Sequence, residues 1–177
     1  FRSSRDAMKH RIGMVFQHFM LVKELSCLEN IIIGMEPAKY FVINKKAARE
    51  KILALMDQYG MKVPLEKAAG TLSVGEQQKL EIIKVLYRGA DIIILDEPTA
   101  VLTPQETEEL FEQLKLLREN GHTIIFISHK LNEVKALCNR MTILRDGKTM
   151  GTYEISALDE QEISRLMVGR DVSLDIE

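Results

Sequence analysis

The sequence of 177 residues lacks the features that mark several classes of protein. Its two cysteines, Cys27 and Cys138, lie far apart and form no CxxC pair, which predicts reduced thiols in a cytosolic protein and no disulfide framework. No apolar run approaches the roughly 20 residues that a helix needs to cross a bilayer. The net charge of -2 includes no basic excess, so we predict no nucleic-acid partner.

The remaining composition is that of an ordinary folded domain. Hydrophobic residues make up 46% and charged residues 28%, and the length suits one domain with its own core. We find no internal repeat and no low-complexity tract. The first residue is Phe1, not methionine, so we expect the chain to be part of a longer protein.

Strand and helix patterns alternate along the chain, most clearly after Asn44. Asn44 is expected to cap a helix that has Ile52, Leu53 and Met56 on its apolar face and ends at Gly60. The apolar runs 92–95 and 122–128 are typical of buried parallel strands. The other expected elements are a strand over 12–16, helices over 25–34, 75–88, 104–120 and 131–137, a hairpin over 141–153 with Asp146-Gly147 at its turn, and a last helix capped by Asp159 or Glu162 that ends at Gly169.

This alternation predicts an α/β fold with a mostly parallel sheet. In such sheets ligands bind outside the carboxyl ends of the strands. Gln17, Asp96, Glu97 and His129 each come just after a predicted strand, so this edge is the first candidate for a site.

Two adjacent carboxylates, Asp96 and Glu97, follow the apolar run 92–95, where burial makes charge costly. A magnesium ion would relieve that cost, because it takes one or two carboxylates together with phosphate oxygens and waters. Asp96 would then orient the ion and Glu97 would polarise an attacking water. The alternative is that the pair caps the following turn or binds a nearby arginine.

A Ser-Val-Gly-Glu turn, Ser73 to Glu76, opens the helix over 75–88. The free N–H groups of a helix start can bind phosphate, Ser73 adds a hydroxyl, and Gly75 allows close backbone approach. Taken alone, such a turn is more often an ordinary helix cap. His129 is likewise either a structural histidine or a hydrogen-bond donor to a terminal phosphate.

In this order the motifs resemble the nucleotide-binding domain of ABC transporters. MVFQ with Gln17 looks like the Q-loop, LSVGE like the signature, IIILDEP like Walker B with its catalytic glutamate, AVLT like the D-loop, and ISHK like the switch histidine. HFMLVKELSCLENIIIG and DEPTAVLTPQE further resemble the ATPases of importers for simple sugars and nucleosides. Those proteins usually carry two such domains, and MVGRDV is similar to the end of the first.

The resemblance implies a partial P-loop NTPase (ABC ATPase) fold with a helical signature subdomain, and ATP and Mg²⁺ as cofactors. Glu97 would act as the base and His129 would stabilise the transferring phosphate. Asp96 would hold the magnesium, with Gln17 sensing it. The signature and D-loop residues Ser73, Val74, Gly75, Glu76 and Thr103 would face nucleotide bound mainly by a second domain.

The resemblance also implies partners and a location. The partners would be a second nucleotide-binding domain, in the same chain or a homodimer, membrane permease subunits and, indirectly, an extracytoplasmic solute-binding protein. The protein would lie peripherally on the cytoplasmic face of the membrane. We expect residues 1–17 to end a core strand and the Q-loop, 18–88 to form the helical subdomain, 89–153 the ATPase core, and 154–177 a last helix and the start of a linker.

Three positions depart from the family pattern. Val74 replaces a signature glycine, Glu76 replaces glutamine, and Thr103 stands where the D-loop commonly has aspartate. No GxxxxGK[ST] loop occurs in the 177 residues, so we expect an amino-terminally truncated domain that is poorly stable, binds ATP weakly and is inactive alone. A non-transport ABC ATPase and a catalytically dead interaction module remain as alternatives. The short interval between Gln17 and Ser73, without heptads, disfavours the coiled-coil arms of DNA-repair ATPases.

Overall fold

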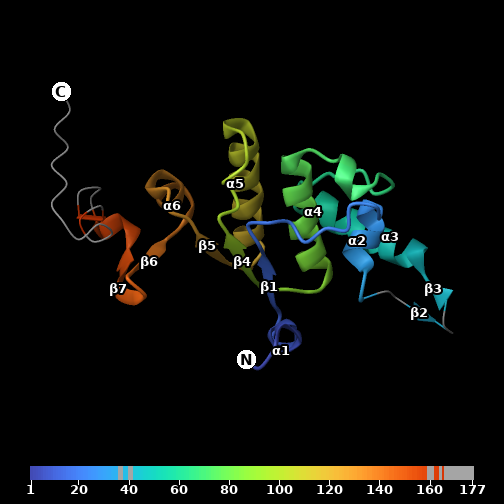
Figure 1. The fold of residues 1–177 in the computed structure, drawn as a ribbon, viewed down its shortest axis with the longest axis horizontal. Helices are drawn as coiled ribbons and strands as arrows, with labels where there is room; N and C mark the ends of the chain where they lie inside the picture. The colour runs from blue at the N-terminus through green and yellow to red at the C-terminus, as the bar shows by residue number, and fades with distance from the viewer. Residues whose placement is uncertain (36–37, 40–41, 159–161, 164, 166–177) are drawn as a thin grey trace. The chain divides into compact units, whose positions relative to one another are not determined.

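The computed structural model describes residues 1–35, 38–39, 42–158, 162–163 and 165. The chain divides into two compact units, residues 1–129 and 130–177 (Figure 1). Among the described residues, no helix is both long and apolar enough to cross a membrane. No disulfide joins the two described cysteines, Cys27 and Cys138.

A parallel sheet organises the first unit. Its strands are β1 (Ile12–Val15), β4 (Ile92–Asp96) and β5 (Thr123–Ile127), in the order β1-β4-β5. Both pairings are parallel, with Val15 opposite Leu95 and Leu95 opposite Phe126. The predicted α/β fold with a parallel sheet is therefore confirmed, and the carboxyl ends of all three strands lie at one edge.

The helices of this unit begin at residues that can cap them. Ser26, Ser73 and Thr103 each cap a helix whose third residue is a glutamate, and Asn44 caps α3 through the N–H of Ala47. The remaining elements are α1 (Ser4–Lys9), α2 (Cys27–Ile32), β2 (Ala38–Lys39), β3 (Val42–Ile43), α3 (Lys45–Gln58), a 3-10 turn (Ala69–Thr71), α4 (Val74–Tyr87) and α5 (Pro104–Glu119).

Helices α4 and α5 cover one face of the sheet. Gly13 of β1 lies so close to Val85 of α4 that a Cβ there would collide with it, and Phe111 of α5 makes an edge contact with Phe126 of β5 at 6.0 Å. Ile93 and Leu95, on the same face by register, are fully buried. One part of the core of the unit therefore lies between β4 and these two helices.

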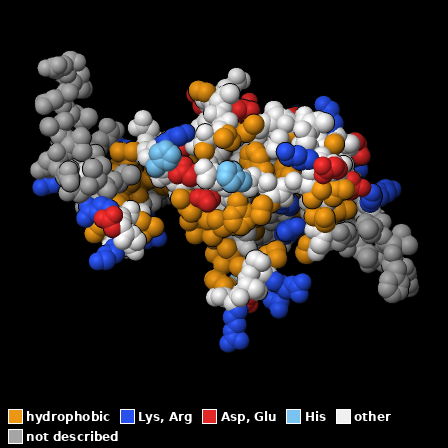
Figure 2. Space-filling model, viewed as in Figure 1, with side chains coloured by type: hydrophobic (Ala, Val, Ile, Leu, Met, Phe, Trp, Pro, Cys, Tyr) orange, Lys and Arg blue, Asp and Glu red, His pale blue; other side chains and the backbone are white. Residues whose placement is uncertain are grey.

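The opposite face of the sheet is only partly covered, which corrects two expectations. Ile125 and Ile127 of β5 are 45% and 44% exposed, and Ile94 of β4 is half-buried, so neither strand is covered on both faces. Hydrophobic side chains gather on the surface over β1 and β4 (Figure 2). The apolar runs predicted the strands correctly, but α4 and α5 both lie on the other side of the sheet. Leu53 of α3, predicted to face inward, is 42% exposed as well.

The second unit contains a helix and a hairpin. Helix α6 (Leu131–Leu137) precedes β6 (Arg140–Arg145) and β7 (Lys148–Glu154), which pair antiparallel, and a 3-10 turn (Ile155–Ala157) follows. Asp146 and Gly147 both have positive φ, 50° and 72°, as the predicted tight hairpin turn requires. The predicted last helix, with Asp159 at its start and Gly169 at its end, lies mostly outside the described residues.

Candidate functional site

Four predicted site residues lie at the carboxyl edge of the sheet. Asp96 is the last residue of β4 and stands opposite Ile127 of β5, and the N–H of Glu97 donates to the Ile127 carbonyl over 3.0 Å. Gln17 follows β1 by two residues, and His129 follows β5 by two. The placement inferred from the strand ends is therefore observed, although Gln17 is exposed and makes no hydrogen bond within the described part of the chain.

Glu97 and His129 form a close pair. Nδ1 of His129 donates to Oε1 of Glu97 over 2.8 Å. The His129 side chain is 71% exposed, whereas that of Glu97 is only 20% exposed. The second carboxylate oxygen of Glu97, Oε2, is buried without a hydrogen-bond partner in the described structure. A buried carboxylate oxygen normally finds a donor, so this atom keeps an acceptor position that the described side chains do not use.

The backbone at Glu97 is unusual as well. Its φ is 47°, in the left-handed region that residues with a side chain rarely enter. The conformation is held from both sides, because the N–H of Glu97 bonds to β5 and its carbonyl accepts the N–H of Ala100 over 3.1 Å. Such conformations gather at functional sites, where the rest of the fold maintains them.

The amino end of α4 is a capping box. Oγ of Ser73 accepts the N–H of Glu76 over 3.2 Å, and Oε2 of Glu76 accepts the N–H of Ser73 over 2.8 Å. This arrangement explains the glutamate that departs from the family signature, because its carboxylate neutralises the start of its own helix. Val74 at the next position is 37% exposed.

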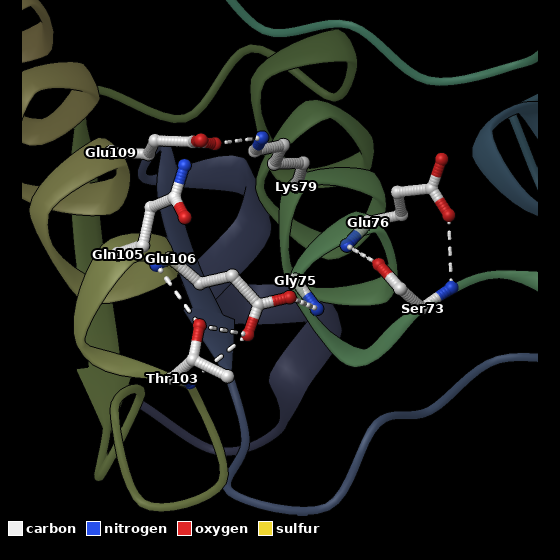
Figure 3. Close-up of a pocket in the computed structure, with 8 residues that line it drawn as sticks. All are labelled: Ser73, Gly75, Glu76, Lys79, Thr103, Gln105, Glu106 and Glu109. Atoms are coloured by element: carbon white, nitrogen blue, oxygen red, sulfur yellow. Dashed lines mark hydrogen bonds and ion pairs between the residues drawn. The ribbon is translucent and has the colours of Figure 1, made fainter.

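Glu106 of α5 links the starts of two helices (Figure 3). Its Oε2 accepts both the N–H and the hydroxyl of Thr103 over 3.0 Å, and its Oε1 accepts the N–H of Gly75 over 3.2 Å. A Cβ on Gly75 would lie 2.5 Å from Oε1 of Glu106, so only glycine fits there without displacement. Thr103, the departure in the D-loop, is therefore also part of a helix cap.

An open pocket of about 430 Å³ lies between α4 and α5. Lys79 of α4 pairs with Glu109 of α5 over 2.7 Å at its wall. Hydrogen bonds from Thr103, then from Gly75, hold the pKa of Glu106 below its ordinary value of 4.5. The lining residues are Ser73, Gly75, Glu76, Lys79, Thr103, Gln105, Glu106 and Glu109.

Sequence reasoning missed four of these lining residues: Lys79, Gln105, Glu106 and Glu109. The spacing of Thr103 and Glu106 is that of a capping box, which indicates a helix start but not the contact with Gly75. No hydrogen bond or ion pair in the described residues joins this pocket to the Glu97–His129 pair. Nor does any set of three His, Cys, Asp or Glu side chains in the described residues form a metal-binding cluster.

Comparison with known proteins places these features in a family. The sequence model of the family described as "ABC transporter" matches residues 2–100. The nucleoside import ATP-binding protein NupA of Lactococcus lactis is 50% identical over 92% of this chain, and the guanosine import ATP-binding protein NupO of Bacillus subtilis is 48% identical over 94%. A ribose import ATP-binding protein, RbsA, of Bacillus subtilis is 39% identical over 98%. The chain spans about a third of the length of these relatives.

Solved structures agree on the fold. The chain is similar to cbiO1 of Clostridium perfringens, part of the ABC transporter complex cbiONQ, with a TM-score of 0.73, 26% identity, and coverage of 93% of this chain and 66% of that one. An inward-facing metal-chelate type ABC transporter gives a TM-score of 0.77 at 22% identity, over 90% of this chain and 64% of that one. These likenesses confirm the predicted ABC ATPase fold. Because the family model also matches more than half of the sequence, the chain belongs to the ABC transporter family.

Proposed function

We propose that this chain is part of the ATP-hydrolysing subunit of an importer for simple sugars or nucleosides. The observation that carries the proposal is the Glu97–His129 pair, in which one carboxylate oxygen is fixed by the histidine and the other is buried and unpaired. A base that must hold an attacking water needs such an oxygen in a fixed position. The relatives named for nucleoside, guanosine and ribose import indicate the class of solute.

The residues at the strand ends would have different roles at the phosphate. Glu97 would accept the proton of the water through Oε2, while His129 fixes the carboxylate through Oε1 and stabilises the transferring phosphate. Asp96 and Gln17 would hold Mg²⁺ together with water and phosphate oxygens, which fits an ion that takes few protein ligands. Bound there, Mg²⁺ would neutralise charge on the phosphates of ATP.

The start of α4 would contact the nucleotide bound mainly by a second such domain. In the other two capping boxes the hydroxyl donates to the box glutamate, from Ser26 to Glu29 and from Thr103 to Glu106. Ser73 has no such bond in the described structure, so its hydroxyl hydrogen is free to donate to a phosphate oxygen. The N–H of Gly75 can bind a phosphate only if its hydrogen bond to Glu106 breaks. Ser73 is therefore the main donor in this proposal, with Val74, Gly75, Glu76 and Thr103 shaping the surface around it.

Membership of the family supports a proposal for the wider assembly. A second nucleotide-binding domain, in the same chain or in a homodimer, would complete each ATP site. Residues 18–88 would face the permease subunits at the cytoplasmic side of the membrane, and an extracytoplasmic binding protein would deliver the solute to the permease. We propose no nucleic-acid partner.

The test uses the protein at the full length of its relatives, expressed with its permease. Wild-type protein is expected to hydrolyse ATP in a magnesium-dependent way and to copurify with the permease. Glu97→Gln removes the base but keeps the shape, and should lower kcat by about 10²–10⁴-fold with ATP binding retained. Glu108→Gln, an exposed carboxylate on α5, serves as the matched control and should leave kcat within about twofold.

Either of two results would overturn the proposal. One is ATP hydrolysis that survives Glu97→Gln, which would remove Glu97 from the chemistry. The other is hydrolysis by a protein that never associates with a permease, which would favour an ABC ATPase without a transport role. Wild-type protein that binds no ATP would instead support an interaction module.

A further inference from the structure

Helix α4 carries two charged side chains that are buried. The Glu81 side chain is 4% exposed and that of Lys84 is 11% exposed, and Nζ of Lys84 lies 2.6 Å from Oε2 of Glu81. Taking a carboxylate and an ammonium out of water is expensive, and an apolar pair of similar size often gives equal or greater stability. The pair therefore needs an explanation other than stability.

Both charges also bind the main chain of one residue. Oε1 of Glu81 accepts the N–H of Met20 over 2.7 Å, and Nζ of Lys84 donates to the Met20 carbonyl over 3.1 Å. The Met20 side chain itself is 66% exposed and takes no part in these bonds. The ion pair thus fixes the main chain at residue 20, independently of the side chain there.

A second buried side chain reinforces the same segment. Asn30 of α2 is 2% exposed, accepts the N–H of Val22 over 2.8 Å and donates to the Val22 and Leu25 carbonyls over 3.0 and 3.2 Å. Residues 17–25 contain no helix or strand, so buried side chains of α2 and α4 supply bonds that a regular element would have made itself. In Figure 1 this segment leaves the end of β1 and runs past α4 to α2.

We propose that Glu81 and Lys84 are positioning residues that fix the Gln17 segment to the helix that starts at Ser73. Gln17 lies three residues before the fixed point, and Ser73 lies eight residues before Glu81, about 12 Å along a rigid helix. A displacement of α4 is therefore transmitted to Gln17, and a displacement of the segment is transmitted to Ser73. This inference rests on the proposed function, in which Gln17 and Ser73 act on nucleotide in different sites.

The test replaces the pair by apolar residues in the full-length protein. The double variant Glu81→Leu/Lys84→Met keeps the volume, removes the bonds to Met20 and leaves no buried charge behind, so it is expected to fold. The control is Glu112→Leu/Lys115→Met on the surface of α5. It removes an ion pair with the same sequence spacing, in which Lys115 Nζ lies 2.8 Å from Glu112 Oε1 and the Glu112 and Lys115 side chains are 72% and 40% exposed. Lys84→Arg, which keeps the cation, serves as the conservative variant.

Hydrogen exchange without nucleotide measures the attachment directly. The double variant should speed exchange of the Met20 amide at least tenfold, with faster exchange across residues 18–25 and an unchanged melting temperature. Steady-state kinetics then measure its consequence: kcat for ATP should fall about tenfold or more with a smaller change in KM. The surface control should change neither exchange nor kcat, and Lys84→Arg should recover most of the wild-type rate.

The outcomes separate this inference from the function on which it rests. Unchanged exchange at Met20 in the double variant would refute the attachment, whether or not the protein hydrolyses ATP. Faster exchange with an unchanged kcat would show that the attachment exists but positions nothing that the reaction needs, which also overturns the inference. Wild-type protein without ATPase activity, but with the expected exchange, would instead count against the proposed function.

Discussion

The contact between Gly75 and Glu106 predicts that the effect of Gly75→Ala on stability changes sign when Glu106 is removed. Gly75→Ala places a methyl group 2.5 Å from Oε1 of Glu106 and 2.9 Å from its carboxyl carbon. Neither atom belongs to a free side chain, because the same carboxylate accepts two bonds from Thr103. The methyl group must therefore either strain the packing of α4 against α5 or force Glu106 out of its place.

Both outcomes lower the free energy of unfolding by a similar amount. Overpacking of this kind costs about 1–3 kcal/mol. Displacing Glu106 loses the hydrogen bond to the Gly75 N–H and disturbs the cap of α5, which together cost about 1–2 kcal/mol for this partly exposed carboxylate. Alanine gains about 1 kcal/mol over glycine through helix propensity. The net expectation is a loss of about 1 kcal/mol, or a fall in melting temperature of about 3 °C for a protein of this size.

A double-mutant cycle with Glu106→Ala measures this contact. Glu106→Ala alone should destabilise by about 1–2 kcal/mol, through the lost bonds to Thr103 and Gly75. In that background the obstacle is gone, so Gly75→Ala should be neutral or stabilising by about 0.5–1 kcal/mol. Urea denaturation of the four proteins gives the required free energies of unfolding.

The result that refutes the reasoning is additivity. If Gly75→Ala destabilises by the same amount, within about 0.5 kcal/mol, with and without Glu106, then Glu106 is not what requires glycine at residue 75. A loss of ATPase activity without any loss of stability would assign the glycine to ligand contact alone.

Three further predictions concern other residues. His129→Ala should lower kcat for ATP about 10²-fold with little change in ATP binding, and an equal loss of binding would contradict its place beside Glu97. Hydrogen bonds from Ser26 and the Lys45 ammonium lower the pKa of Glu29 to about 2, so its contribution to stability is present above pH 4.5 and lost as the pH falls towards 2. Glu29→Gln should flatten acid unfolding curves in that range, and an unchanged curve would rule this out. Asn30→Ala should cost about 2–4 kcal/mol in urea denaturation, because it leaves main-chain groups of residues 22–25 unpaired, whereas a cost below about 1 kcal/mol would mean that water replaces the amide.

Local chemistry in the sequence predicted most of the elements. Thr103 and the glutamate three residues later form the capping box that their spacing indicates, and Asp146-Gly147 makes the hairpin turn. The strand ends also placed Glu97 and His129 at one edge of the sheet, because parallel strands share an edge whatever packs on them. These features depend on residues that are close in sequence or on topology alone.

The errors and omissions depend on packing between distant segments. Apolar runs predicted buried strands, yet nothing in the sequence of β5 states which face the helices cover, and Ile125 and Ile127 are largely exposed. Glu81 and Lys84 lie among apolar residues of α4, and nothing local indicates that both bind the main chain of Met20. The contact from Glu106 to Gly75 likewise joins residues that only the approach of α4 to α5 brings together.

The three helices α2, α4 and α5 all start with a hydroxyl residue followed by a glutamate three places later. Each of these helix starts already has an anion of its own, so a second anion that approaches α4 meets little unopposed positive potential. Attraction between opposite charges, which added electrolyte weakens, would then contribute little to nucleotide binding at Ser73. Affinity at this end of the molecule should consequently vary less with potassium chloride concentration than affinity at a lysine-lined phosphate site.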